Sequence, residues 1–457
     1  MATTTIPAKP GFISSVITVL GGQAACAALG LVTEICYARL LGPAGRGQIS
    51  LCMMLIGVGV LVAGMGGVAP IVVWAADHTK KPSDWLPSIL TLGVLGSALA
   101  CTIWAIIFWH GHFAAFRTIT TPLALTVLLT IPASVFSGYL TAILAGTERF
   151  KIRAGIALAD QFSGLAGFVV LLLILGASAE TAVLGNLIGI VIGGIIVLFL
   201  LRDILPTTWQ IRSTPDIISG IRMGLRGQPG NMATALYYRF DVFLVSFFLG
   251  PKQVGLYALA VVISEALWQI PQAVSWALFP RTARTQNEGA GNFTCLVIRQ
   301  ILLIACISGV GIALVSPIAV PLIFGQSFRP SVAAIWWLIP GTVALSLAKV
   351  VAADLTARSK TGYSTVFAII SLGISVPLDW FLIPRMGIQG ASLTSSVAYT
   401  TDAILFLAAL KHVLKVSWKT LLVPSEQDFE LYRQVFTRGR CWVRSVFIPL
   451  AGTEGSS

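Results

Sequence analysis

Two basic side chains stand within long apolar stretches of this sequence. Arg239 lies near the middle of one stretch, and Lys349 lies about two helical turns from the end of another. A charge at the centre of a membrane-spanning helix costs roughly 2.5 to 3.5 kcal/mol on insertion scales, so it needs a partner or a ligand. Arginine suits phosphate in particular, because its planar fork donates two parallel hydrogen bonds and stays charged. Both residues are therefore candidates for binding an anion, and the alternative is that Arg239 pairs with Glu265 on the next helix.

Three carboxylates occupy similar positions near the middle of apolar stretches: Asp241, Glu265 and Asp402. A carboxylate held away from water can bind and release a proton or a cation, so these three are candidates for coupling transport to H⁺ or Na⁺. The alternative for Asp402 is that neighbouring Ser and Thr hydroxyls, such as those of Thr400 and Thr401, satisfy it. Four further acids lie nearer the ends of the stretches, where we expect them to reach the interface: Glu34, Asp160, Asp354 and Asp379.

The stretches that position these groups predict transmembrane helices. Of the 457 residues 56% are hydrophobic and 11% are charged, against about 25% charged in a soluble domain, and the mean hydropathy is +0.88. We therefore predict an all-α integral membrane protein rather than a soluble enzyme. Twelve runs are long and apolar enough to span a bilayer: 13–38, 48–75, 86–109, 119–145, 154–175, 181–201, 223–249, 254–279, 296–324, 332–356, 362–383 and 388–410.

The basic residues predict how these helices face. Most of the 30 Lys and Arg fall in the N-terminus, the tail and every second loop, which is the bias of the cytoplasmic side. We therefore place both termini in the cytoplasm and the chain in the cell inner membrane. The formal net charge of +12 then reports topology, and no nucleic-acid partner is expected.

An internal repeat divides the chain into two halves. The pattern L-G-P-x-x-x-G occurs at Leu41–Gly47, after the first span, and at Leu249–Gly255, after the seventh, and a weaker echo links Leu144–Arg153 with Leu355–Ser364. In each L-G-P copy the first glycine ends a helix, proline prevents its continuation, and we expect the second glycine to open the next turn.

Two parallel repeats of six helices predict two pseudo-symmetric six-helix lobes around a central cavity. The predicted division is a cytoplasmic N-terminus (1–12), an N-lobe (13–201), a basic cytoplasmic linker (202–222), a C-lobe (223–413) and a cytoplasmic tail (414–457) with an amphipathic helix. There is no ATP-binding G-x-x-x-x-G-K-[ST] loop, no zinc spacing and no nucleophile elbow. No cofactor, no metal and no enzymatic activity are therefore expected.

The stretch Tyr37–Gly47 resembles the first-loop motif of the polysaccharide-lipid flippases, the O-antigen and exopolysaccharide exporters of the multidrug/oligosaccharidyl-lipid/polysaccharide superfamily. Arg239-Phe240-Asp241 through Pro251, then Gly255–Ala260, is similar to the start of that family's second half, and Trp268, Pro271 and Phe279-Pro280-Arg281 extend the match. The resemblance covers residues 10–415 and is most specific in the two L-G-P segments.

The resemblance implies a transporter that flips polyprenyl-diphosphate-linked oligosaccharide units by alternating access, in contact with membrane lipids and with a polysaccharide polymerase and other assembly proteins. It makes Arg239 and Lys349 the expected diphosphate-binding residues, with Arg39 at the outer mouth and Arg222 and Arg226 at the inner mouth, unless these three only anchor the loops. A drug/cation antiporter of the same superfamily has the same helix count and stays an alternative. A membrane glycosyltransferase or ligase is less favoured, because the outer loops are short.

Overall fold

The computed structural model describes residues 12–77, 79, 81–110, 119–202, 215–269, 271 and 288–423, and this part of the chain is helical without strands. The helices are α1 (Phe12–Gly64), α2 (Val68–Ala76), α3 (Pro82–His110), α4 (Thr121–Gly146), α5 (Phe150–Leu175), α6 (Ala179–Leu201), α7 (Pro215–Leu249), α8 (Pro251–Glu265), η2 (Ala266–Trp268), α10 (Glu288–Phe324), η3 (Gln326–Phe328), α11 (Ser331–Ala357), α12 (Gly362–Met386), α13 (Ile388–Leu414) and α14 (Trp418–Leu422).

Ten of the described helices are long and apolar enough to cross a membrane. The prediction of an all-α membrane protein is thereby confirmed. The first of them, α1, contains the predicted span 13–38 and the larger part of 48–75, and α8 with η2 falls in the described part of an eighth span. The arrangement is therefore consistent with twelve crossings, while the end of the predicted span 254–279 lies outside the described residues.

The chain reverses direction within α1, at the first L-G-P motif. Gly42 has φ 64° and ψ −174°, and the Glu34 carboxylate lies 2.6 Å from the Arg46 guanidinium. In a straight helix these two residues would be about 18 Å apart along the axis. Gly250 makes the same reversal between α7 and α8, with φ 79° and ψ 178°. Glycine is needed at both points because a side chain is strained at positive φ.

The second glycine of each motif has a different role from the predicted one. Gly47 and Gly255 lie inside helices, and they bring the two motifs into backbone contact. A Cβ atom on Gly47 would lie 1.8 Å from the Pro251 carbonyl oxygen, and one on Gly255 would lie 1.8 Å from the Pro43 carbonyl oxygen. The prediction that these glycines open a turn is wrong: they allow α1 and α8 to touch.

The weaker sequence echo corresponds to one turn built twice. After α4, the Arg149 N–H donates to the Leu144 carbonyl and Glu148 has φ 56°; after α11, the Lys360 N–H donates to the Leu355 carbonyl and Ser359 has φ 62°. The same backbone hydrogen bond recurs at matching positions, and in both turns the residue before its donor has positive φ. The repeat therefore extends to the connections between the helices.

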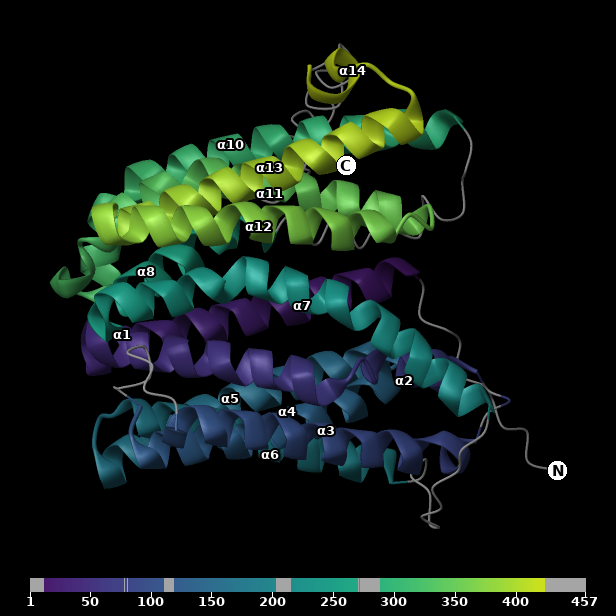
Figure 1. Ribbon diagram of the computed structural model, residues 1–457, viewed down its shortest axis with the longest axis vertical. Helices are drawn as coiled ribbons and strands as arrows, with labels where there is room; N and C mark the ends of the chain where they lie inside the picture. Colours follow the sequence, from purple (N-terminus) through teal and green to yellow (C-terminus); the bar gives the residue numbers. More distant parts are fainter. Residues whose placement is uncertain are drawn as a thin grey trace, which may run out of the picture.

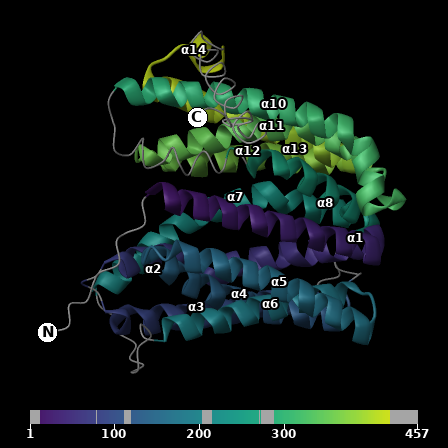
Figure 2. The same cartoon turned by 180° about the vertical axis from the view of Figure 1, so that it is seen from behind.

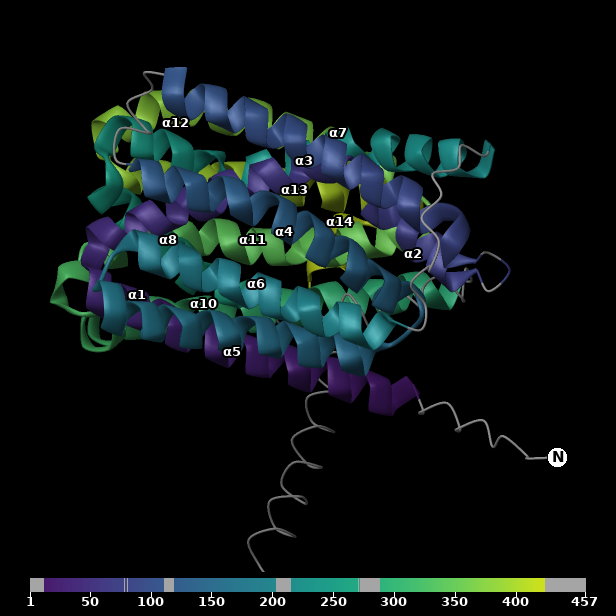
Figure 3. The same ribbon diagram turned by 90° about the horizontal axis from the view of Figure 1, so that it is seen from below.

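The helices form two groups, which we call the first half (residues 12–202) and the second half (215–423). Figure 1 shows α1–α6 in the lower part of the molecule and α10–α13 in the upper part, with α7 and α8 next to α1 between them; Figure 2 shows the same layers from behind. One apolar core lies wholly between Tyr37 and Leu201. Two more lie in the second half, and one of these also includes Ala38 of α1. Figure 3 shows α3, α4, α6 and α5 across the face of the first half.

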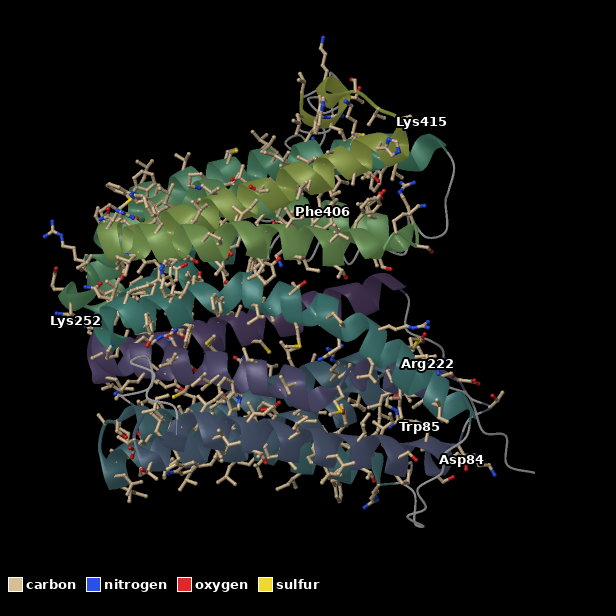
Figure 4. The ribbon with its side chains drawn as sticks, in the orientation of Figure 1. Asp84, Trp85, Arg222, Lys252, Phe406 and Lys415 are labelled. Carbon is tan, nitrogen blue, oxygen red and sulfur yellow. The ribbon has the colours of Figure 1, made fainter. Side chains whose placement is uncertain are left out.

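The two ends of the bundle are both closed by contacts between the halves. At one end, which we call the L-G-P end, Gly47 meets Pro251 and Gly255 meets Pro43. At the opposite end a Cβ atom on Gly66 would lie 2.3 Å from the Gly224 carbonyl oxygen, and one on Gly224 would lie 2.4 Å from that of Gly66. Figure 4 places Lys252 at the first end and Arg222, Asp84 and Lys415 at the second.

Three predicted boundaries differ from the structure. The predicted span 48–75 is interrupted between α1 and α2, where Met65 and Gly66 have positive φ. The predicted linker 202–222 is partly helical, since α7 begins at Pro215, and residues 203–214 lie outside the described part. In the tail the structure describes α14, whereas the predicted amphipathic helix falls among residues 424–457, outside the description.

Candidate functional site

The charges predicted to matter most meet in the second half, where α7 and α8 run side by side. The Arg239 guanidinium donates to the Glu265 carboxylate at 3.1 Å, so the predicted pair exists. The side chain of Arg239 is nevertheless 43% exposed, against 13% for Glu265. One oxygen of Glu265, Oε1, is buried without a hydrogen-bond partner among the described residues. Arg239 therefore has spare donors and an open side that an anion can approach.

Glu265 also lines a cleft between the halves. The cleft has a volume of about 1100 Å³ and is formed by α1, α5, α8 and α10. Most of its lining is apolar, and its polar members are Glu34, Gln161, Glu265, Gln269, Ser308 and Ser316. A cleft of this kind suits an extended apolar chain.

Lys349 is held by aromatic rings. Its ammonium group lies 4.1 Å from the centre of the Trp268 ring and 5.0 Å from that of Tyr238, which come from the segment after α8 and from α7. Cation–π contacts of this kind stabilise a desolvated ammonium by about 2 kcal/mol. Glu265 and Asp402 lie near enough to act on Lys349 electrostatically. The described residues place no carboxylate within ion-pair distance of it, so its charge can still take an anionic partner.

Lys349 and Asp402 share a pocket of about 380 Å³ inside the second half. Its lining comes from α7, α11, α12 and α13, and includes Tyr237, Tyr238 and Phe406; Figure 4 marks Phe406 on α13. The side chain of Asp402 is thus directed to a cavity. The hydroxyls of Thr400 and Thr401 donate to their own helix, to the carbonyls of Ser396 and Val397, and therefore do not satisfy Asp402. The hydroxyl that lies near enough to act on Asp402 is that of Ser371 on α12.

Asp241 is enclosed in a hydrogen-bond network. Its carboxylate accepts from the Tyr257 hydroxyl of α8, from the Ser395 hydroxyl at 3.2 Å and from the Val242 N–H at 2.7 Å, and 6% of the residue is exposed. A carboxylate with three donors is well satisfied. Asp241 therefore ties α7, α8 and α13 together.

Asp379 of α12 lies near this network, and the expectation drawn from its position in the sequence is wrong. It was expected to reach the interface, but it is 2% exposed. Its Oδ1 is buried without a hydrogen-bond partner that meets the usual geometry among the described residues. The Thr394 hydroxyl of α13 lies near enough to act on Asp379 as a hydrogen-bonding group, and Asp241 acts on it electrostatically. Asp354 does not reach the interface either, because it is fully buried against Arg358 and Thr294.

The three mouth arginines behave differently from one another. Arg39 is not free at the mouth, since its guanidinium crosses to the other half and donates to the Leu322 and Ile323 carbonyls of α10, the second at 2.8 Å. Arg222 and Arg226 are exposed on α7, and Figure 4 places Arg222 at the opposite end. The structure therefore brings Arg239, Lys349, Glu265 and Asp402 into one neighbourhood and leaves these three outside it.

The aromatic residues of the site were not predicted as functional. Trp268 follows Glu265 by three residues and Tyr238 directly precedes Arg239, so each lies next to a predicted charge. Residues three apart on a helix share a face, which is the signal that pointed to Trp268.

Comparison with known proteins gives several matches. A family model described as "Polysaccharide biosynthesis protein" matches residues 36–333. The "Putative O-antigen transporter" of Shigella flexneri is 25% identical over 393 residues, which are 80% of this chain and 90% of that protein. The "Probable low-salt glycan biosynthesis flippase Agl15" of Haloferax volcanii is 20% identical over 395 residues, which are 84% of this chain and 80% of that protein.

Solved structures match the fold. The lipid II flippase MurJ in an inward closed conformation has a TM-score of 0.72 at 14% identity, covering 94% of this chain and all of that one. A multidrug resistance MATE transporter in an inward-facing conformation has a TM-score of 0.70 at 14% identity, covering 88% of this chain and 98% of that one. At this identity the likeness concerns the fold alone.

Proposed function

This chain belongs to the polysaccharide biosynthesis protein family, and from that membership we propose that it flips lipid-linked oligosaccharide repeat units, carried on a polyprenyl diphosphate, across the cytoplasmic membrane. The relatives it matches are named as an O-antigen transporter and a glycan biosynthesis flippase. The observation that carries the proposal is the pair of cations, Arg239 and Lys349, inside the membrane-spanning part of the second half.

The geometry supports a specific role for the two cations. A diphosphate that crosses a low-dielectric region needs compensating positive charge, since an unpaired ion there is prohibitive. Arg239 is already partly exposed and gives up only one hydrogen bond, to Glu265, when phosphate arrives. Lys349 lies over aromatic faces, so binding it breaks no ion pair. The polyprenyl chain would lie in the apolar cleft of about 1100 Å³.

The acids supply a candidate for energy coupling. Asp379 is buried beside Thr394 and close to Asp241, and within the described part of the chain its Oδ1 has no well-formed hydrogen bond, so a proton or a small cation would satisfy it. We assign coupling by H⁺ or Na⁺ to this group first. Asp402 and Glu265 stand next to the cations, and each can compete with the anion for them.

Membrane, topology and partners belong to the same proposal. The placement in the inner membrane, with both termini in the cytoplasm, is supported by the basic loops, whose described members Arg222 and Lys415 lie at one end of the bundle. A polymerase that receives the flipped unit is the expected neighbour in the membrane.

The drug/cation antiporter is the second candidate, and the shared MATE-like fold favours it. The pocket that holds Asp402 also has the aromatic walls that organic cations prefer. Lys349 on the same wall repels a cation, however. The flippase is therefore the better supported function.

The experiment measures flipping of a fluorescent polyprenyl-diphosphate-linked sugar in proteoliposomes. Arg239→Ala should lower the rate at least tenfold while the protein still inserts. Arg385→Ala is the matched control, because Arg385 is an exposed arginine that stacks on Phe381 of its own helix and bonds its carbonyl at 2.9 Å. An unchanged rate in Arg239→Ala would contradict the phosphate role. In cells, loss of the protein should leave lipid-linked glycan in the inner leaflet; raised drug sensitivity with normal surface polysaccharide would favour the antiporter.

A further inference from the structure

The first half contains a polar pocket that none of the roles above uses. It has a volume of about 340 Å³, lies between α4 and α5, and is closed on one side by Ile190 of α6. Three hydroxyl residues of α4 line it, together with two charged residues of α5: Ser134, Ser137, Thr141, Arg153 and Asp160. This volume is at the small end of the ligand-pocket range, which runs from about 300 to 1000 Å³.

Most of these groups have spare hydrogen-bonding capacity. The Thr141 hydroxyl donates to carbonyls of its own helix, but among the described residues no partner is found for the hydroxyls of Ser134 and Ser137. Asp160 also lines the pocket, and its Oδ1 is buried against Gly193 of α6 without a hydrogen-bond partner among the described residues. Polar groups at membrane depth that lack partners are unfavourable unless water or a ligand satisfies them. Their gathering around one cavity points to a polar ligand.

The carboxylate of Asp160 is held in place by α6. A Cβ atom on Gly193 would lie 1.3 Å from Asp160 Oδ1, so the carboxylate occupies the space where a side chain would otherwise stand. On the other wall, a Cβ atom on Gly138 would meet no atom within 4 Å, which leaves the cavity open there. Two glycines thus shape the pocket: Gly193 leaves room for the Asp160 carboxylate, and Gly138 leaves the cavity unfilled.

The pocket is the counterpart of the one around Lys349 in the second half. The shift along the sequence that relates Leu144 to Leu355 places Ser134, Ser137, Gly138 and Thr141 of α4 onto Leu345, Ala348, Lys349 and Ala352 of α11, and Arg153 and Ala157 of α5 onto Ser364 and Ala368 of α12. All six residues of each set line their own pocket. Both halves therefore contain a cavity at the same place in the repeat, but the side chains that line the two cavities differ.

The changes set what each cavity can bind. In the second half a lysine stands on the fourth helix of the repeat and aromatic rings surround it. In the first half that position is Gly138, hydroxyls replace Leu345 and Ala348, and Arg153 and Asp160 lie about 10 Å apart along one helix. Arginine donates, the carboxylate accepts, and serine hydroxyls do both. That combination, neutral overall, matches a polyhydroxylated molecule and not a multiply charged one.

We propose that the first-half pocket binds one sugar ring of the lipid-linked glycan, through Asp160, Ser134 and Ser137, while the cations of the second half hold the diphosphate. This inference rests on the proposed function. The two halves then bind different parts of the substrate. The second half binds the constant diphosphate, and the first half binds the variable glycan.

The test compares two probes on the full-length protein in lipid nanodiscs: undecaprenyl diphosphate, and undecaprenyl diphosphate carrying one N-acetylglucosamine. The sugar should tighten binding to the wild type. Asp160→Asn should weaken binding of the sugar-bearing probe about tenfold, the factor expected for one strong hydrogen bond, and leave the bare diphosphate unchanged. Ser137→Ala should act in the same direction with a smaller factor. Ser163→Ala is the control, because its hydroxyl bonds the Ala159 carbonyl and lines no part of this pocket.

The outcomes separate this inference from the function on which it rests. If both probes bind equally well to the wild type, or if Asp160→Asn affects both alike, the sugar site is refuted while diphosphate recognition stands. If Asp160→Asn removes only a Na⁺ dependence of binding, the pocket is a cation site and the inference is overturned. If the wild type binds neither probe, the flippase function fails, and the sugar site fails with it.

Discussion

Replacing Gly47 by alanine should open the L-G-P end of the molecule. The new Cβ atom would lie 1.8 Å from the Pro251 carbonyl oxygen, whereas an ordinary contact begins at 3.4 Å, so the two backbones must separate by about 1.6 Å, the difference of these distances. The Pro251 oxygen is a backbone atom and the backbone of residue 47 fixes the position of the Cβ atom, so no side-chain rotation relieves the clash. Overpacking of this kind costs about 1–3 kcal/mol, which shifts the balance between closed and open by about 5- to 150-fold.

The assay is a distance measurement between spin labels. Labels on Thr121 and Lys252, which are exposed in the two halves at the L-G-P end, should move apart in Gly47→Ala, in a background with the native cysteines replaced. Gly224→Ala should instead separate Lys151 from Lys360 at the opposite end, because its Cβ atom would lie 2.4 Å from the Gly66 carbonyl oxygen.

Two glycines serve as matched controls. Gly57 of α1 and Gly227 of α7 lie on the same helices, and a Cβ atom on either would meet nothing within 4 Å. Alanine at these positions should leave both distances unchanged. The reasoning is refuted if Gly47→Ala leaves the Thr121–Lys252 distance at its wild-type value, or if both test variants widen the same end.

Three further substitutions test single contacts. Arg39→Ala removes the hydrogen bonds from α1 to the α10 carbonyls. In the same distance measurement it should widen the L-G-P end, but less than Gly47→Ala, because each bond contributes about 0.5–1.5 kcal/mol. An unchanged distance would mean that these bonds do not hold the end closed. Asp354→Ala leaves Arg358 without its buried partner and should lower the stability by about 3–5 kcal/mol, seen as early thermal unfolding in detergent; unfolding at the wild-type temperature would argue against the pair. Tyr257→Phe removes one donor from Asp241 and should lower the stability by about 1–3 kcal/mol in the same unfolding measurement. A loss near zero would show that Asp241 finds another donor.

The sequence determined the helices and the points at which the chain turns back. Three signals act locally: apolar residues on all sides of a helix, glycine at positive φ, and proline at the first helical position. The breaks at Gly42-Pro43 and Gly250-Pro251 could therefore be predicted without the fold. The second glycine of each motif was misread, because its reason is a backbone on another helix, which local pattern does not contain.

The site was predictable as a set of charges but not as an arrangement. A charge inside an apolar stretch is visible in sequence, and so Arg239, Lys349, Glu265 and Asp402 were found. Their partners depend on how each helix is rotated and how deep it lies against its neighbours. These are tertiary quantities.

Tertiary packing alone placed aromatic rings from two segments around Lys349. It buried Asp379, although its position in the sequence indicated the interface. The sequence also contained the repeat, but only the folded chain showed that it encloses two equivalent cavities, since a cavity forms where side chains of three or four helices stop short of one another.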